Sequence, residues 1–189
     1  MKYCSQCAAP VSLRVPAGDN RPRFVCEACH TIHYQNPNIV AGCIPEWEGR
    51  ILLCRRAIEP RFGLWTLPAG FMENGETTLQ AALRETEEEA HARVDVQGLY
   101  TVFNLPHIDQ VYMMFRGRLQ DLDFGPGTES SEVRLFRAEE IPWDELAFPV
   151  IRETLRLYLA DRERGEFPLH FGDIERLEGD PPRYRVAMY

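Results

Sequence analysis

Four cysteines in two C-x2-C pairs constrain what this chain can fold into more than any other feature of its sequence. Cys4 and Cys7 form the first pair, and Cys26 and Cys29 form the second after a gap of eighteen residues. Two such pairs are typical of a zinc site in which four thiolates surround the metal and leave no open position for chemistry. Because a segment this short has almost no apolar core, we expect residues 1–36 to fold as a small zinc ribbon around a structural Zn²⁺.

The rest of the chain has the composition of one globular domain. The protein has 189 residues, of which 44% are hydrophobic, enough for one sizeable core beside a small appended module. Residues 61–76 are rich in glycine and proline and indicate a long structured loop. A helix is predicted over 77–90, where Thr77 and Gln80 fit a capping box, and an amphipathic helix over 147–165. Strands are predicted over residues 38–44, 50–57, 92–105, 110–119 and 132–138.

This order of strands and helices predicts an α/β domain over residues 37–165. Residues 166–189 are left as a C-terminal tail whose pattern predicts no structure. Cys43 and Cys54 lie in apolar runs, so we expect them to be ordinary core thiols.

Charge and hydropathy exclude several classes of protein. The formal net charge of −8 disfavours non-specific binding to nucleic acid. No apolar stretch approaches 18 residues, so no membrane span is expected. The first residues lack the basic and apolar regions of a signal peptide, and we therefore expect a cytoplasmic protein.

Four glutamates crowd into the second half of the helix predicted over 77–90. At about 100° per residue, Glu85, Glu88 and Glu89 fall on one side, whereas Glu87 points elsewhere. The apolar stripe lies on the opposite side and comprises Leu79, Ala82, Leu83, Thr86 and Ala90. Three neighbouring carboxylates form either a solvated acidic face or a site for a hard divalent cation such as Mg²⁺.

The preceding loop favours the cation. Residues 70–92 read GFMENGETTLQAALRETEEEAHA, which resembles the Nudix box, G-x5-E-x7-R-E-U-x-E-E-x-G-U, where U is a bulky aliphatic residue. Six of its seven fixed residue types match, and His91 replaces the second glycine. That glycine ends the helix, where a left-handed conformation is often required, and histidine tolerates this conformation better than most residues. Thr86 and Ala92 replace aliphatic residues of the pattern.

The resemblance implies an α/β/α sandwich around a mixed sheet, and an enzyme that hydrolyses a nucleoside diphosphate linked to another group. It assigns Glu85, Glu88 and Glu89 to the binding of Mg²⁺ or Mn²⁺ and to catalysis. Of the other matching residues, it implies that Glu76 and Arg84 fix the loop against the helix, and that Gly70 permits a sharp turn. A homodimer is expected from the same resemblance.

A general base for the attacking water is the next requirement of such a reaction. A box glutamate could serve, as could a glutamate of the later segment GPGTESSEVRLF, where Glu129 and Glu132 lie. We predict Glu132 as a further catalytic residue by its resemblance to a glutamate in an equivalent loop of some Nudix pyrophosphatases. The alternative is a solvated loop.

The zinc ribbon narrows the expected substrate. NADH pyrophosphatases of the Nudix family share this layout, but their SQPWPFPxS signature is absent here, where the chain reads TVFNLPHIDQVYMMF. The whole chain is more similar to the FAD pyrophosphatases of plant plastids, which also act on ADP-ribose, through segments such as YQNP, GLWTLPAGF and EEIPWDELAF. This likeness implies cleavage of FAD to FMN and AMP, or of ADP-ribose to AMP and ribose 5-phosphate. NADH pyrophosphatase is the alternative.

Candidate substrate-binding residues are arginines and aromatic residues near the box. Arginines can receive phosphate, although ordinary surface charge explains them equally well. Aromatic rings can stack on a base, although buried aromatic residues more often belong to the core. The candidates are Arg55, Arg56, Arg61, Trp65, Phe71 and Phe103. His33 and His107 are expected to be structural rather than ligands.

The alternative class is a non-catalytic regulator that senses a nucleotide or binds nucleic acid. Zinc ribbons often bind nucleic acid, and some Nudix domains sense ligands without catalysis. The acidic charge and the presence of all three box carboxylates argue against this reading. We therefore expect a dinucleotide substrate and no nucleic-acid partner.

Overall fold

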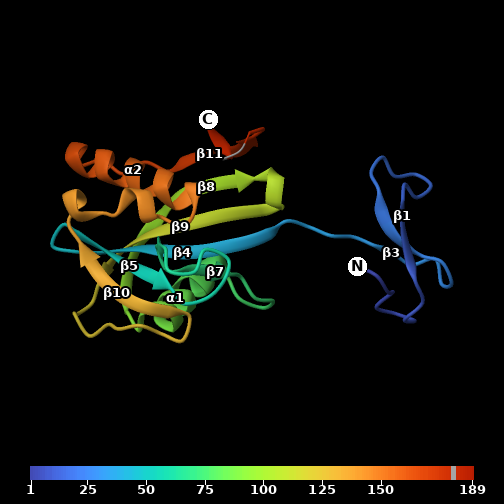
Figure 1. Ribbon diagram of the computed structural model, residues 1–189, viewed down its shortest axis with the longest axis horizontal. Coiled ribbons are helices and arrows are strands. Elements are labelled where there is room, and N and C mark those ends of the chain that lie inside the picture. The colour runs from blue at the N-terminus through green and yellow to red at the C-terminus, as the bar shows by residue number, and fades with distance from the viewer. Residues whose placement is uncertain (180–181) are drawn as a thin grey trace. The chain divides into compact units, whose positions relative to one another are not determined.

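The chain divides into two compact units, residues 1–37 and 38–189, which we describe separately (Figure 1). The computed structural model describes residues 1–179 and 182–189. The sequence placed this boundary one residue earlier, between residues 36 and 37. No helix in the described parts of the chain has the length and apolar composition needed to cross a membrane.

The first unit is a three-stranded antiparallel sheet of order β1-β2-β3. Strands β1 (Val11–Arg14) and β2 (Arg23–Cys26) form a hairpin, and β3 (Ile32–His33) adds a short third strand. Each C-x2-C pair forms a tight turn that ends in a left-handed residue, Ala8 after the first pair and His30 after the second. The unit is thus a ribbon with a cysteine turn at each end.

The second unit is built on a mixed sheet, which has nine strands in the described residues. The main path is β10-β5-β4-β9-β8-β11-β12, with β6 paired to β5 and β7 paired to β4. Strand β4 runs parallel to β9, and β8 runs parallel to β11, whereas the other pairs are antiparallel. The strands are β4 (Asn38–Trp47), β5 (Arg50–Arg56), β6 (Trp65–Thr66), β7 (Ala69–Phe71), β8 (Val94–Leu105), β9 (Gln110–Leu119), β10 (Ser130–Phe136), β11 (His170–Leu177) and β12 (Arg183–Met188).

Two α-helices cover opposite faces of this sheet (Figure 1). Helix α1 (Thr78–Ala90) packs Ala81 and Ala82 on one face, in a cluster that includes Cys43. Helix α2 (Pro149–Arg164) packs Ile151 and other apolar residues on the other face, which holds the larger core cluster. The result is the α/β/α sandwich expected from the sequence. Single-turn helices η1 (Pro106–Ile108), η2 (Ala138–Glu140) and η3 (Trp143–Glu145) lie in connections.

The structure differs from the sequence expectation at two places. The segment 61–76, expected as one long loop, contains the short strands β6 and β7. The described residues of the expected tail, 166–179 and 182–189, carry β11 and β12 and extend the main sheet. Ile174 of β11 has no exposed surface and belongs to the main core cluster, so this segment is part of the second unit.

A buried carboxylate attaches this C-terminal segment to the domain. Asp161 of α2 has no exposed surface, and its Oδ2 accepts a hydrogen bond of 2.7 Å from the Tyr100 hydroxyl. His170 Nε2 lies 2.6 Å from the same oxygen, and Arg164 pairs with Oδ1. Although burial alone would raise it, the pKa of Asp161 lies below its ordinary value because His170 and Tyr100 bind the ionised form. Asp161 therefore joins α2, β8 and β11.

Replacement of Asp161 by alanine should destabilise the second unit. The Tyr100 hydroxyl would lose its buried acceptor, and we expect the free energy of unfolding to fall by about 3 kcal/mol in urea denaturation at neutral pH. Asp161→Asn keeps an acceptor and should lose less. A lowered pKa gives stability that is complete above the ordinary value of 3.8 and lost as the pH falls through the folded-state pKa. The gap between wild type and Asp161→Ala should therefore narrow in acid, and a gap that is absent at neutral pH would contradict this role.

Candidate functional site

The start of α1 is fixed by its capping residues. Thr77 Oγ1 accepts a hydrogen bond of 3.2 Å from the backbone N–H of Gln80, and Gln80 Oε1 accepts one of 2.8 Å from the N–H of Thr77. This is the capping box predicted from the sequence, and it is confirmed. Because the cap fixes the first turn, the side chains of the following turns take defined directions toward the preceding loop.

Arg84 ties that loop to the helix through five hydrogen bonds. Its Nε and Nη2 donate to the two carboxylate oxygens of Glu76, at 3.1 and 2.8 Å, and Nη2 also donates to the carbonyl of Phe71 at 3.1 Å. Its Nη1 donates to Glu85 at 2.7 Å and to Glu88 at 3.0 Å. One guanidinium thus connects the end of β7, the loop and two of the three glutamates on the helix.

Gly70 leaves the space that the carboxylate of Glu85 occupies. A methyl group added at Gly70 would place its carbon 2.3 Å from the Glu85 carboxylate carbon. A side chain at this position would force the Glu85 carboxylate to move, so only a glycine leaves that carboxylate in its place.

Glu89 is the most buried of the three glutamates, with 6% of its surface exposed. Its Oε2 accepts a hydrogen bond of 3.1 Å from the backbone N–H of Ala69. Burial raises the pKa of Glu89 to about 8 despite that bond, and the charges of Glu85 and Glu129 add to the rise. Burial also raises the pKa of Glu85, against the nearby Arg84. A bound cation would favour the ionised form of these carboxylates.

The end of α1 is packed against the loop between β9 and β10. His91 ends the helix in the left-handed conformation, with φ 46°, as expected for the residue in the place of the box glycine. The backbone N–H groups of Gly125 and Gly127 donate to the carbonyls of Ala90 and Glu89, at 2.9 and 3.1 Å. A methyl group added at Gly127 would lie 1.7 Å from the carbonyl oxygen of Glu88. The loop therefore lies directly against the turn that carries two of the glutamates.

Glu129, rather than Glu132, is the glutamate of this loop that acts on the cluster. Its charge contributes to the raised pKa of both Glu85 and Glu89. Glu132 lies on β10 and pairs with Arg55 Nη1 at 3.8 Å. The role of Glu132 as a further catalytic residue stays a prediction, and Glu129 is a second candidate for the proton acceptor near the cluster.

The donor set fits a hard divalent cation by its chemistry. Glu85, Glu88, Glu89 and Glu129 offer carboxylate oxygens, the ligands that Mg²⁺ and Mn²⁺ prefer, and two of them lie in surroundings that penalise uncompensated negative charge. In this structure Arg84 draws Glu85 and Glu88 to itself. The Glu88 side chain is 59% exposed and has room to turn toward a cation.

The four cysteines of the first unit form a closed cluster. Their Sγ atoms lie within 4.8 Å of one another, with separations of 3.7 Å from Cys4 to Cys29 and 3.4 Å from Cys7 to Cys26. Four sulfurs at about 2.3 Å from a zinc ion would lie about 3.8 Å apart, so the cluster has the size that zinc requires. His33 Nε2 lies 3.3 Å from Cys4 Sγ, beside the cluster rather than within it.

Two of the predicted stacking residues are core residues. Phe103 has no exposed surface and Trp65 has 6%, and both lie in the main core cluster, where Trp65 meets Phe136 edge to face at 4.9 Å. Neither ring offers a face to a ligand, so we withdraw both as candidates. Phe71, at the end of β7, is exposed.

The predicted phosphate-binding arginines also differ in their surroundings. Arg55 and Arg56 use their Nε–H groups to bind carbonyls of the loop between β5 and β6. Arg61 lies in that loop and is exposed. A cavity of about 450 Å³ at the other end of β5, lined by Glu48, Arg50, Arg137 and Arg162 among others, contains none of the residues predicted from the sequence.

Sequence reasoning missed the backbone groups that complete the site. These groups are the backbone N–H of Ala69 and the backbone at Gly127, which lies close to the helix. Side-chain patterns in the sequence do not predict such main-chain contacts. Gly127 belongs to the segment GPGTESSEVRLF, and a glycine there was the one sign in the sequence of a close backbone approach.

Comparison with known proteins identifies related families for both units. A family model described as Nudix N-terminal matches residues 2–35, and one described as NUDIX domain matches residues 36–158. The crystal structure of a NUDIX hydrolase from Nitrosomonas europaea is 59% identical in sequence, with a TM-score of 0.90, and the match covers 93% of this chain and 99% of that one.

Curated relatives are more distant. An ADP-ribose pyrophosphatase of Methanocaldococcus jannaschii is 29% identical over 130 residues, which cover 65% of this chain and 76% of that protein. A protein named NAD-capped RNA hydrolase NudC, from Vibrio parahaemolyticus, is 27% identical over 168 residues, which cover 85% of this chain and 62% of that protein. This chain therefore matches only about six tenths of the length of that relative.

Gly70→Ala should damage the carboxylate cluster and spare the fold. The added methyl would displace only the flexible end of Glu85, so we expect the free energy of unfolding to change by about 1 kcal/mol or less. Affinity for Mn²⁺, measured by electron paramagnetic resonance, should fall about tenfold. Gly125→Ala is the matched control, because its methyl would meet no atom within 4 Å. Unchanged Mn²⁺ affinity in Gly70→Ala would contradict this account of the cluster.

Proposed function

The chain belongs to the Nudix hydrolase family, and from this premise we propose that it is a metal-dependent pyrophosphatase that cleaves the diphosphate of ADP-ribose, of FAD, or of both. The observation that carries the proposal is the arrangement around Arg84. One guanidinium binds the loop and two helix glutamates, while the third glutamate is held by the backbone N–H of Ala69. The three carboxylates are thereby gathered beside the loop before any substrate arrives, and the exposed Glu88 has room to turn toward a cation.

In the proposed reaction, Glu85, Glu88 and Glu89 would hold Mg²⁺ or Mn²⁺ beside the diphosphate. The cation would neutralise phosphate charge and lower the pKa of water. Glu129 is the acceptor that we favour for the proton of the attacking water, because its charge acts on the cluster while Glu132 pairs with Arg55. Arg84, already bound to Glu76, would keep the loop in place during the reaction.

We further infer that Cys4, Cys7, Cys26 and Cys29 bind one structural Zn²⁺. The size of the cluster and its all-thiolate donor set support zinc rather than Mg²⁺. Four protein ligands leave no position for a substrate, so the first unit contributes no chemistry through this metal.

Support for the substrate comes from two directions. ADP-ribose is in the name of the curated relative from Methanocaldococcus jannaschii, and FAD rests on the sequence likeness to the plastid enzymes. The NudC relative favours a second candidate, the diphosphate of NAD or NADH, because its match extends over both units of this chain. Its name also includes capped RNA, so the expectation of a substrate without nucleic acid remains a prediction, as do the homodimer and the cytoplasmic location.

A product assay separates these substrates. The purified chain with Mg²⁺ or Mn²⁺ should convert ADP-ribose to AMP and ribose 5-phosphate, or FAD to equal amounts of FMN and AMP, far faster than it cleaves NADH. Chromatography of the products measures all three reactions side by side. Faster cleavage of NADH would favour the second candidate, and free phosphate as the first product would contradict a pyrophosphatase.

Glu89→Gln should lower kcat by about 100-fold or more while fold and zinc content remain, because the variant loses a preorganised charge at the reacting centre. Glu87→Gln, an exposed glutamate on the same helix, is the matched control and should keep its activity. Glu129→Gln should lose more of kcat than Glu132→Gln. Full activity of Glu89→Gln would refute the metal assignment, and the reverse order at the last two positions would return the role of base to Glu132.

A further inference from the structure

The loop between β5 and β6, residues 57–64, has a fixed conformation. The backbone N–H of Arg56 donates to the carbonyl of Leu64, and the N–H of Gly63 donates to the carbonyl of Arg56, both at 2.9 Å. Inside this closure, the N–H of Leu64 donates to the carbonyl of Arg61 at 3.2 Å. The end of the loop is thus hydrogen-bonded to Arg56, the last residue of β5, just before the loop begins.

Two arginine side chains brace the same loop. Arg55 Nε donates to the carbonyl of Gly63, and Arg56 Nε donates to the carbonyl of Pro60, both at 2.8 Å. The guanidinium of Arg56 also lies 5.2 Å from the ring centre of Phe148. These arginines are therefore positioning residues of the loop through their Nε–H groups, and their part in binding phosphate stays a prediction.

The loop presents an aromatic ring to solvent at its tip. Phe62 is 63% exposed, although the residues around it are tied to the strands. A single exposed phenylalanine is ordinary on a protein surface. Here the ring sits on a braced loop, so little conformational freedom remains to be lost when a flat ligand covers it.

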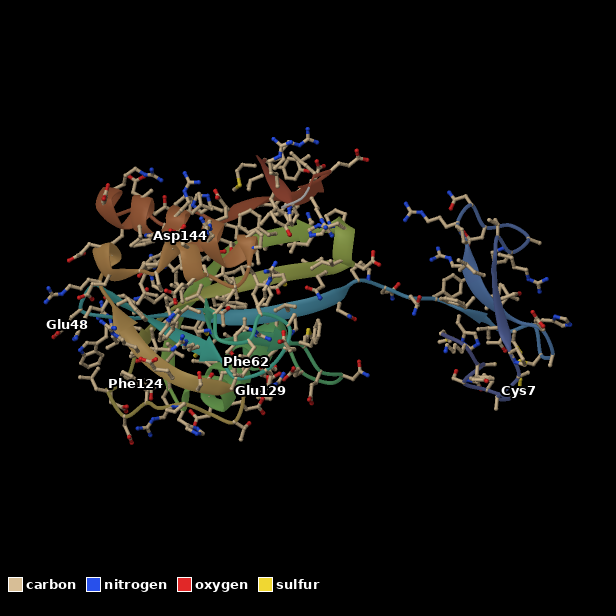
Figure 2. All side chains as sticks on the ribbon, in the orientation of Figure 1. Cys7, Glu48, Phe62, Phe124, Glu129 and Asp144 are labelled. Carbon is tan, nitrogen blue, oxygen red and sulfur yellow. The ribbon has the colours of Figure 1, made fainter. Side chains whose placement is uncertain are left out.

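The loop adjoins the carboxylate cluster. The backbone N–H of Ala57, its first residue, donates to the carbonyl of Glu129 at 2.8 Å. The charge of Arg56 lowers the pKa of Glu89. Strand β6 follows the loop, and three residues after its end comes Ala69, whose N–H binds Glu89. In the view of Figure 2, the labelled Phe62 and Glu129 lie near each other on the second unit.

We propose that Phe62 stacks on the nucleobase of the nucleoside-diphosphate substrate, with the loop 57–64 as its rigid support. A substrate whose diphosphate lies at the glutamates carries its base a few bonds away, and every base offers a flat π face to an aromatic ring. Trp65 and Phe103 are buried and cannot serve. The inference rests on the proposed function for the position of the diphosphate.

Binding of AMP without turnover tests this role. We would measure the dissociation constant of AMP by calorimetry with Mg²⁺ present, and compare it with that of ribose 5-phosphate, which has no base. Phe62→Ala should weaken AMP about tenfold and leave ribose 5-phosphate unchanged, since base stacking on one aromatic side chain has this magnitude. Phe62→Tyr, which keeps the ring, should restore AMP affinity.

Phe171→Ala is the matched control, because Phe171 is an exposed phenylalanine on β11 outside the site, and its AMP affinity should equal that of wild type. With the preferred substrate, Phe62→Ala should raise KM by a similar factor and change kcat little. Four results would each overturn the proposal. Phe62→Ala could keep the AMP affinity of wild type, or lose affinity for AMP and ribose 5-phosphate equally. Wild type could fail to bind AMP, or AMP affinity could fall only in Phe71→Ala.

These outcomes stay separate from the fate of the proposed function. If AMP binding depends on Phe62 while neither ADP-ribose nor FAD is cleaved, the stacking role stands and the pyrophosphatase proposal fails. If both substrates are cleaved and AMP binding does not depend on Phe62, the pyrophosphatase proposal stands and the stacking role fails.

Discussion

The guanidinium of Arg84 is the interaction on which the rest of the site depends. It binds the loop at Glu76 and Phe71 and the helix at Glu85 and Glu88, so four separate groups take their positions from one side chain. Lysine has the charge but not the planar fork of donors that reaches these groups together. The arrangement also places a fixed positive charge among carboxylates that would otherwise repel one another, which lets the cluster exist before a cation is bound.

Close main-chain approaches complete what Arg84 begins. Gly70 brings β7 against the carboxylate of Glu85, and Gly127 brings the loop before β10 against the carbonyl of Glu88. Backbone from two segments therefore lies against this turn of the helix, where Glu89 is buried and has a raised pKa while the Glu88 side chain is exposed. Burial of this negative charge is unfavourable, and a bound divalent cation would offset that cost.

Most of the fold and the centre of the site could be read from the sequence, because long periodic segments and fixed spacings carry strong signals. Helix α1 begins one residue from its predicted start, and the four cysteines converge as their spacing requires. The short strands β6 and β7 could not be read, since two or three residues show no periodicity. Neither could the surroundings of Phe103, Arg55 and Arg56, because residue type alone does not tell a core ring from a stacking platform, or a loop brace from a phosphate ligand.

The cysteines of the two units differ in their reactivity toward oxidants. In the first unit three pairs of sulfurs lie 3.4 to 3.7 Å apart and two of the four cysteines are exposed, so an oxidant acting on the metal-free ribbon would find thiols already placed to form disulfides. Cys43 and Cys54 are buried on the α1 side of the sheet, and burial raises the pKa of both thiols, to about 11 for Cys43, which keeps them unreactive. Oxidation would therefore alter the thiols of the ribbon first and leave the buried thiols of the second unit reduced, so that the two units respond to different conditions of the surrounding solution.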